Sequence, residues 1–237
     1  MIGCEAISVK QSISIIIPTY NEEKNIARIV KACKDIGKIF KTEIIVVDGG
    51  SVDKTVEIAK KSKVDKIIAF PFKRGKGADF WAGGLVSCGD YIIQIDADFQ
   101  FMPSEIPLFV EQLDRGADVV IASRFGGGKI EKGSITARNL IGNWLISALV
   151  SLAVGRRITD VMAGFKGFRR EAFLALDLRE RHFEYEAEVV VKAIRRGMNL
   201  VEVPITYKRR RSGQSGIRAI RDGLNVMRAI IVARLLS

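Results

Sequence analysis

The sequence has a single histidine, His182, which lies in the charged stretch Arg179–His182. No Gly-x-Ser-x-Gly motif is present, so a Ser/His/Asp hydrolase is disfavoured and His182 is expected at the surface. The chain also lacks the Gly-x-x-x-x-Gly-Lys-Ser/Thr motif of P-loop enzymes, and no Gly-x-Gly-x-x-Gly motif follows a predicted strand. Phosphoryl transfer by a P-loop and dinucleotide-dependent oxidation are therefore disfavoured as well.

Cysteines and long apolar runs are also scarce. Cys4, Cys33 and Cys88 show no Cys-x-x-Cys spacing, which predicts a reducing compartment and no disulfide framework. Residues Met1–Gln11 have neither the basic start nor the long apolar stretch of a signal peptide, so no secretory targeting is expected. The longest apolar run, Trp144–Val154, is shorter than the ~18 residues that span a bilayer. Any membrane contact is therefore predicted to lie on the membrane rather than through it.

The composition is that of a globular protein with an excess of positive charge. The chain has 237 residues, of which 48% are hydrophobic and 27% are charged, and its formal net charge is +11. Residues 195–237 hold ten Lys or Arg and two Asp or Glu, so 10 − 2 = +8 of that charge lies there. This favours a polyanionic partner such as a nucleotide diphosphate, an anionic membrane or nucleic acid.

Short β-branched runs alternate with segments of helical period, the pattern of βα units around a mostly parallel sheet. The strands predicted for the first half are Ser12–Ile17, Glu43–Val47, Lys66–Phe70, Tyr91–Ile95 and Asp118–Ala122, with a helix capped by Ser104 running through Leu113. The second half is predicted to hold an apolar helix over 135–154, a strand over 166–169, a helix over 184–195, a strand over 199–205 and a basic amphipathic helix over 217–237.

The predicted strands end in residues that suit ligand binding. Pro18, Asp48, Asp96 and Arg124 each lie at or just after a strand end. In open parallel sheets, ligands bind outside the carboxyl ends of the strands, so the four residues are expected to line one crevice.

The step Asp96-Ala97-Asp98 places two carboxylates at the end of an apolar strand, where uncompensated charge is costly. A divalent cation would satisfy both, and oxygen ligands suit Mg²⁺ or Mn²⁺ bound together with substrate phosphates. Gln100 offers a further neutral oxygen. The alternative is a solvated turn in which Asp98 caps the helix near Pro103.

Other crevice residues have both a binding and a structural interpretation. A carboxylate at Asp48 can accept hydrogen bonds from a nucleobase, or it can close a tight turn with Gly49 and Gly50. Arg74, Lys76 and Arg124 are cations suited to a diphosphate, and the alternative for Arg74-Gly75-Lys76-Gly77 is an exposed basic turn.

Several motifs resemble those of family 2 glycosyltransferases, and among them the chain is most similar to dolichol-phosphate mannosyltransferases. The resemblance covers about residues 13–236. The motifs that carry it include Ile15-Ile16-Ile17-Pro18-Thr19-Tyr20-Asn21-Glu22, Val46-Val47-Asp48-Gly49-Gly50-Ser51, Arg74-Gly75-Lys76-Gly77, Asp96-Ala97-Asp98-Phe99-Gln100, Ser123-Arg124, Asp160 with Gly164-Phe165, Phe183-Glu184-Tyr185-Glu186, Glu202-Val203-Pro204-Ile205 and Arg210-Arg211-Ser212-Gly213-Gln214-Ser215.

The resemblance implies an A-type glycosyltransferase fold, with helices on both faces of a mostly parallel sheet. It implies a catalytic domain over 1–216, composed of a nucleotide-sugar-binding half over 12–125 and an acceptor half over 126–216, and an amphipathic helix over 217–237. The implied donor-site residues are Pro18, Tyr20, Glu22, Val47, Asp48, Lys76 and Ala97, with Asp96, Asp98 and Gln100 around the metal and Arg124 and Arg210 around phosphates. The chain departs from the family at Gly49, where a second Asp is usual, and at Gly216, where a Lys is usual.

The expected reaction is inverting transfer of a hexosyl group from GDP-mannose or UDP-glucose to dolichyl or another polyprenyl phosphate, at the cytoplasmic face of the membrane. Asp96, Asp98 and Arg124 are the expected catalytic residues, and an anionic acceptor needs no strong base. If the acceptor is instead a saccharide or protein hydroxyl, Asp160 and Glu186 are candidate bases, each of which can equally be the structural partner of an arginine. A sugar-phosphate nucleotidyltransferase and an RNA-binding protein are weaker alternatives, the latter because aromatic residues are scarce in the basic segment.

Overall fold

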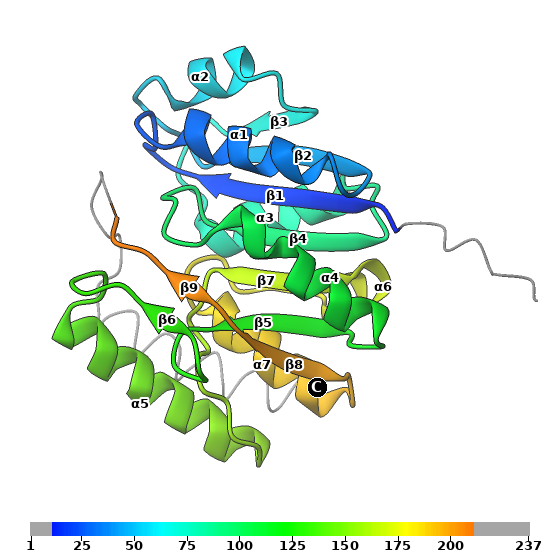
Figure 1. Cartoon of the computed structure of the whole chain (residues 1–237), viewed down its shortest axis with the longest axis vertical. Coiled ribbons are helices and arrows are strands. Elements are labelled where there is room, and N and C mark those ends of the chain that lie inside the picture. Colours follow the sequence, from blue (N-terminus) through cyan, green and yellow to red (C-terminus); the bar gives the residue numbers. More distant parts are fainter. Residues whose placement is uncertain (1–10, 211–237) are drawn as a thin grey trace, which may run out of the picture.

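The protein is described by a computed structural model, of which residues 11–210 are described, and its centre is a seven-stranded sheet (Figure 1). The strand order is β3-β2-β1-β4-β7-β5-β8. β7 is antiparallel to both of its neighbours, whereas every other pairing in this sheet is parallel. The strands are β1 (Ile13–Thr19), β2 (Thr42–Asp48), β3 (Lys66–Ala69), β4 (Tyr91–Ile95), β5 (Val119–Ser123), β7 (Phe165–Arg169) and β8 (Leu200–Pro204).

Helices cover both faces of this sheet, and a small second sheet pairs β6 (Lys129–Ile130) with β9 (Thr206–Tyr207). The helices are α1 (Ile26–Ile36), α2 (Thr55–Lys61), α3 (Lys76–Leu85), the short 3₁₀ helix η1 (Pro103–Glu105), α4 (Ile106–Asp114), α5 (Ala137–Val154), α6 (Arg170–Leu176) and α7 (Tyr185–Arg195).

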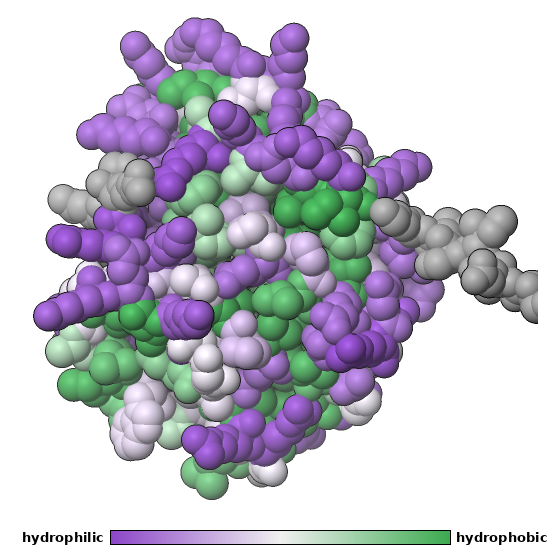
Figure 2. All heavy atoms as spheres, viewed as in Figure 1, coloured by the Kyte–Doolittle hydropathy of each residue, from purple (hydrophilic) through white to green (hydrophobic). Residues whose placement is uncertain are grey.

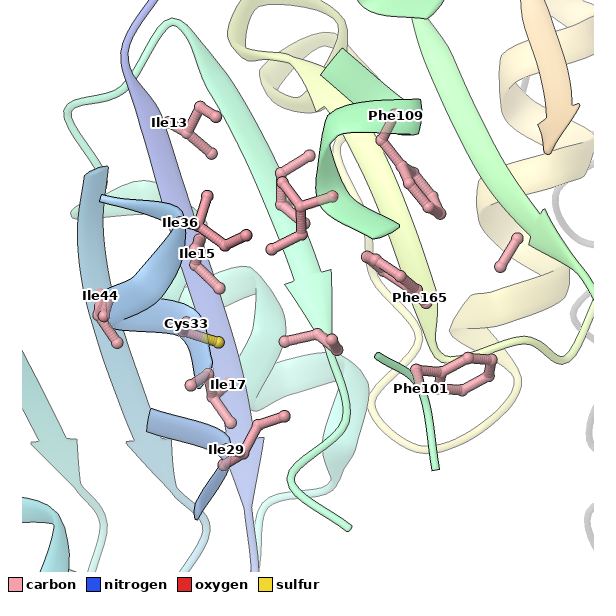
Figure 3. Close-up of a cluster of buried hydrophobic side chains, with 14 of the residues drawn as sticks. Ile13, Ile15, Ile17, Ile29, Cys33, Ile36, Ile44, Phe101, Phe109 and Phe165 are labelled. Carbon is pink, nitrogen blue, oxygen red and sulfur yellow. The ribbon is translucent and has the colours of Figure 1, made fainter. Parts of the chain in front are cut away.

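The buried strands read as continuous apolar runs because successive side chains point to opposite faces and both faces are covered. On β1, Ile13, Ile15 and Ile17 belong to the core cluster that includes α1 and α4, as Figure 3 shows. Ile16 points the other way, into the cluster formed with α3, α6 and α7. The apolar core is therefore divided into two layers by the sheet.

The predicted α/β fold with a mostly parallel sheet is confirmed, and the structure adds elements that the pattern did not reveal. β7 inserts between β4 and β5, so the predicted second half of the chain completes the sheet of the first. The helix α6 and the two-stranded sheet of β6 and β9 were not predicted. Ser104 lies inside η1 and does not cap a helix, because α4 begins after Glu105. The amphipathic helix predicted over 217–237 lies outside the described residues.

Helix α5 is the most apolar surface element among the described residues. It has 18 residues, which by length and composition suffice to cross a membrane, and 17% of it is buried. The expectation that no apolar segment is long enough to span a bilayer is therefore wrong for this helix, because the helix begins well before Trp144. Its N-terminus is capped by the Thr136 side chain, which accepts a hydrogen bond from the backbone N–H of Asn139. Figure 2 shows hydrophilic side chains crowding the region of α1 and α2, with more hydrophobic side chains in the region of α5. The exposed large hydrophobic side chains of α5 are Leu140, Ile141, Trp144, Leu145, Leu149 and Leu152.

Two glycines bring α3 close to its neighbours. A Cβ added at Gly83 would lie 2.7 Å from a methyl carbon of Ile16 and 2.9 Å from one of Val47. A Cβ at Gly84 would lie 2.1 Å from Cζ of Phe173 in α6. Because real Cβ atoms do not approach other atoms so closely, α3 can pack at this distance only with glycine at both positions.

Gly84→Ala is expected to lower the free energy of unfolding by about 1–3 kcal/mol, because the buried ring of Phe173 has no room to move away. Gly142→Ala in α5 is the matched control, since its added Cβ would meet nothing within 4 Å. That control should raise stability by about 0.5–1 kcal/mol through helix propensity. Chemical denaturation followed by circular dichroism measures both, and equal effects of the two changes would contradict the close packing of α3.

Candidate active site

The carboxyl ends of β1, β2 and β4 meet at one edge of the sheet, where the following residues line a cleft, here called the first cleft. Strand β1 supplies Pro18, the turn after β2 supplies Gly49, and β4 is followed by Asp96. The remaining lining residues come from the end of β1 and the loop after it, the loop before α3 and the first turn of α3, the turn after β4, the loop before α7 and the 208–210 segment: Thr19, Tyr20, Glu22, Lys73, Gly75, Lys76, Asp79, Ala97, Asp98, His182, Phe183 and Arg210.

A second cleft adjoins the first and extends toward α5. It begins at Arg124, which follows β5, and includes Arg138 and Asn143 of α5 together with Tyr207 of β9. The residues shared by both clefts are Lys76, Asp96, Asp98, Phe183 and Arg210. The single crevice predicted from the strand ends is therefore two clefts that meet at the Asp96-Ala97-Asp98 step.

Both carboxylates of this step are paired with cations of the chain. Nζ of Lys76 lies 2.7 Å from Oδ1 of Asp96, which otherwise has no hydrogen-bond partner among the described residues. Arg210 forms an ion pair and a hydrogen bond with Oδ2 of Asp98. The turn that holds the step places Phe99 in the left-handed region, with φ at 60°, and the backbone N–H of Gln100 donates to Oδ1 of Asp98 at 3.0 Å.

A chain of buried charges lies beneath Asp96. Glu186 of α7 is 1% exposed and forms ion pairs with Lys76, at 3.0 Å, and with the fully buried Lys166 of β7. Although burial raises the pKa of Glu186, the two lysines hold it below its usual value. Burial raises the pKa of Asp96, which Lys76 only partly offsets. The Tyr185 hydroxyl donates a further hydrogen bond to Glu186 at 2.6 Å.

Arg124 is fixed by a buried carboxylate. Its Nε and Nη2 donate to the two oxygens of Asp160 at 2.6 and 2.8 Å, and its backbone N–H donates to the same carboxylate at 2.9 Å. The guanidinium also lies over the ring of Tyr207, 4.9 Å from its centroid. Asp160 and Glu186, the candidate bases of the sequence analysis, are thus both occupied by cations of the protein.

The predicted donor-site residues divide into two groups. Pro18, Tyr20, Glu22, Lys76, Ala97 and Arg210 line the first cleft. Val47 lies instead in the core, with 0% exposure. Asp48 is buried, and its carboxylate accepts hydrogen bonds from the backbone N–H groups of Gly50, at 3.1 Å, and Ser51, at 2.8 Å. The tight-turn interpretation therefore describes the geometry of Asp48.

The structure also brings in residues that sequence reasoning missed. Lys73 lies over the ring of Tyr20, 4.2 Å from its centroid, whereas Arg74 stacks on Phe70 rather than lining the first cleft. His182, expected to be an ordinary surface residue, is exposed but lines this cleft. Arg138 lines the second cleft. Only Lys73 had a sequence signal, since it adjoins the Arg74-Gly75-Lys76-Gly77 loop.

The oxygen atoms at this site fit a divalent metal. Asp96 and Asp98 supply two carboxylates, and Oε1 of Gln100 lies nearby, 3.3 Å from Nε of Arg210. Residues 11–210 contain no group of three or more His, Cys, Asp or Glu side chains arranged to hold a metal. A set of two carboxylates leaves positions for phosphates and water, which suits Mg²⁺ or Mn²⁺. Lys76 and Arg210 each form an ion pair with one of these two carboxylates.

Comparisons with known proteins identify related chains. The chain is 30% identical over 210 residues to the dolichol-phosphate mannosyltransferase of Pyrococcus furiosus, covering 87% of this chain and 59% of that protein. It is 30% identical over 232 residues to the polyprenol monophosphomannose synthase of Mycolicibacterium smegmatis, covering 91% of this chain and 83% of that protein. It therefore spans less than two thirds of the Pyrococcus protein.

Among solved structures, the glucosyl-3-phosphoglycerate synthase of Mycobacterium tuberculosis in complex with Mn²⁺, UDP-glucose and phosphoglyceric acid matches with a TM-score of 0.73. The identity is 19%, and the match covers 94% of this chain and 80% of that one, which confirms the predicted A-type glycosyltransferase fold. The family profile described as glycosyl transferase family 2 matches residues 14–176. Since that match covers more than half of the chain, the protein belongs to glycosyl transferase family 2 and is a glycosyltransferase.

Proposed function

We propose that this glycosyltransferase moves a hexosyl group, mannose or glucose, from a nucleotide diphosphate sugar to dolichyl or another polyprenyl phosphate, assisted by Mg²⁺ or Mn²⁺. The observation that carries this proposal is the meeting of two clefts at Asp96 and Asp98. One cleft takes the donor and the other the acceptor, so that the reacting groups meet where the carboxylates lie. The relatives named above act on dolichol phosphate and polyprenol according to their names.

The first cleft suits a nucleotide diphosphate. Tyr20, 40% exposed, offers a ring on which a base can stack. Lys76 and Arg210 lie at the other end, beside the two carboxylates, where they are placed to hold a diphosphate. A divalent ion bound by Asp96, Asp98 and Gln100 would neutralise the charge that grows on the leaving diphosphate.

The second cleft suits an anionic acceptor better than a hydroxyl. A sugar or protein hydroxyl needs a positioned base, but Asp160 is held by Arg124, and Glu186 lies between two lysines. A phosphate monoester is already anionic, and Arg124 and Arg138 both line this cleft. The acceptor oxygen then attacks the anomeric carbon from the face opposite the leaving diphosphate, which inverts that carbon.

The exposed apolar side chains of helix α5 support the proposal that the enzyme acts at a membrane surface. Residues of its first half line the second cleft, while Trp144 and Leu152 are 67% and 82% exposed. An apolar helix surface beside the acceptor cleft can enter the headgroup boundary, where the lipid tail of the acceptor resides. We place the enzyme at the cytoplasmic face of the membrane as a peripheral protein.

The donor is found by measuring the melting temperature with GDP-mannose or UDP-glucose in the presence of Mn²⁺. A ligand that binds only the folded protein raises its stability in proportion to the logarithm of ligand concentration over Kd. Incubation with the better donor and a short polyprenyl phosphate should then yield a glycolipid with inverted configuration. Transfer to a saccharide without any glycolipid would show that the acceptor assignment is wrong.

Asp98→Asn is expected to lower kcat/KM for glycolipid formation at least about 100-fold, because it removes a carboxylate from the metal and diphosphate site. The folded state should persist, since Asn keeps the shape of the side chain and can still accept the hydrogen bond from the backbone N–H of Gln100. Glu111→Gln on the exposed surface of α4 is the matched control. Activity of Asp98→Asn within about threefold of that control would contradict the proposed role.

Arg138→Gln is expected to raise the KM for polyprenyl phosphate about tenfold, because one charge-assisted hydrogen bond to the acceptor phosphate is lost. Affinity for the donor nucleotide should stay unchanged, since Arg138 does not line the first cleft. Arg115→Gln at the exposed end of α4 serves as the control. An unchanged KM for polyprenyl phosphate would show that Arg138 does not bind the acceptor.

A further inference from the structure

Gly49, where the sequence departs from the family, lies directly beside the carboxylate of Asp79. A Cβ at Gly49 would lie 2.4 Å from Oδ2 of Asp79, so the Asp79 carboxylate occupies the space that any side chain at position 49 would need. Both residues line the first cleft. Asp79 lies in the first turns of α3, whereas Gly49 follows β2, so two distant segments of the chain supply this arrangement.

The packing of α3 brings Asp79 to this place. Gly83, four residues further along the same helix, lets α3 approach Ile16 and Val47, with an added Cβ only 2.7 Å from Ile16. Residues four apart lie on the same side of a helix, so the side of α3 that carries Asp79 also faces β1 and β2. The carboxylate is therefore held at the strand ends by rigid elements rather than by a loop.

Asp79 is buried but incompletely satisfied. It is 4% exposed, and its Oδ1 is buried without a hydrogen-bond partner among the described residues. Burial raises the pKa of Asp79 to about 6, with Arg74 lowering it and the nearby Asp48 raising it. The N-terminal position in α3 favours a negative charge but leaves Oδ1 without a donor. A buried acceptor without a partner is costly, and a ligand donor would remove that cost.

Asp48 provides the contrast. It lies at the end of β2, but its carboxylate already accepts hydrogen bonds from Gly50 and from both the backbone N–H and the hydroxyl of Ser51. Of the two adjacent carboxylates, Asp79 is thus the one that lines the cleft and retains an acceptor without a donor.

We propose that Asp79 binds the nucleoside part of the donor, accepting a hydrogen bond from a nucleobase N–H or a ribose hydroxyl with the carboxylate that fills the space beside Gly49. This rests on the proposed function, in which the first cleft holds a nucleotide diphosphate sugar. A carboxylate repels phosphate, and Lys76 and Arg210 stand at the Asp96 and Asp98 end of the same cleft. Tyr20 completes the nucleoside end with a ring for stacking.

The test measures binding of UDP, GDP and inorganic pyrophosphate, each with Mn²⁺, by calorimetry. Asp79→Asn and Asp79→Ala should bind the preferred nucleotide about tenfold more weakly than wild type. Their pyrophosphate affinity should change less than about twofold, because the phosphate end of the cleft is intact. The melting temperature without ligand should stay equal or rise, since an unsatisfied buried carboxylate is removed. Asp35→Asn, on the exposed side of α1, is the control.

The 2′-deoxy and 3′-deoxy forms of the preferred nucleotide separate the two donor groups. If wild type and variants bind one of these deoxy nucleotides with equal affinity, the partner of Asp79 is the ribose hydroxyl that this nucleotide lacks. If the difference in affinity persists with both deoxy nucleotides, the partner is the nucleobase. Nucleotide affinities of the variants within about twofold of wild type, or equal losses for nucleotide and pyrophosphate, overturn this inference alone. A wild-type protein that binds neither nucleotide overturns the proposed function together with it.

Discussion

The site depends on one buried carboxylate, Glu186, held between the fully buried Lys166 and the half-buried Lys76. Glu186 of α7 forms ion pairs with Lys166 of β7 and with Lys76 of α3, and Lys76 in turn holds Asp96 after β4. Each of these charges is costly to bury alone, so compensation of all of them requires the four elements to meet in one arrangement. The antiparallel strand β7 matters here because it carries Lys166 into the centre of the sheet, beside β4.

The same constraint accounts for two clefts instead of one. Lys76 and Arg210 stand where the clefts join, each paired with one carboxylate of the Asp96-Ala97-Asp98 step. Gly83 lets α3, which carries Lys76 and Asp79 of the first cleft, approach β1 and β2. The start of α5 and Arg124, fixed by Asp160, form the second. Under the proposed function, donor and acceptor approach a shared pair of carboxylates from different sides.

Most of the first half of the fold could be predicted from the sequence, because each strand there is an apolar run that ends in a turn residue. β1, β2, β3, β4 and β5 all fall within two residues of their predicted bounds. β7 was found as a strand, but its place between β4 and β5 and its antiparallel direction depend on pairings between residues more than 40 positions apart. The helix α6 is one short segment whose period is too brief to recognise.

The sequence by itself determined the family, the A-type fold and the acidic step, since these are carried by local motifs in a fixed order. It could not decide which carboxylates remain available, because that depends on partners distant in the chain. Asp48 and Asp79 show the difference: the strand-end position pointed to Asp48, yet the Ser51 turn engages its carboxylate, and only the approach of α3 to Gly49 brings Asp79 into the cleft. Tertiary packing, through burial and hydrogen-bond partners, decided which carboxylate is left able to accept a hydrogen bond from a ligand.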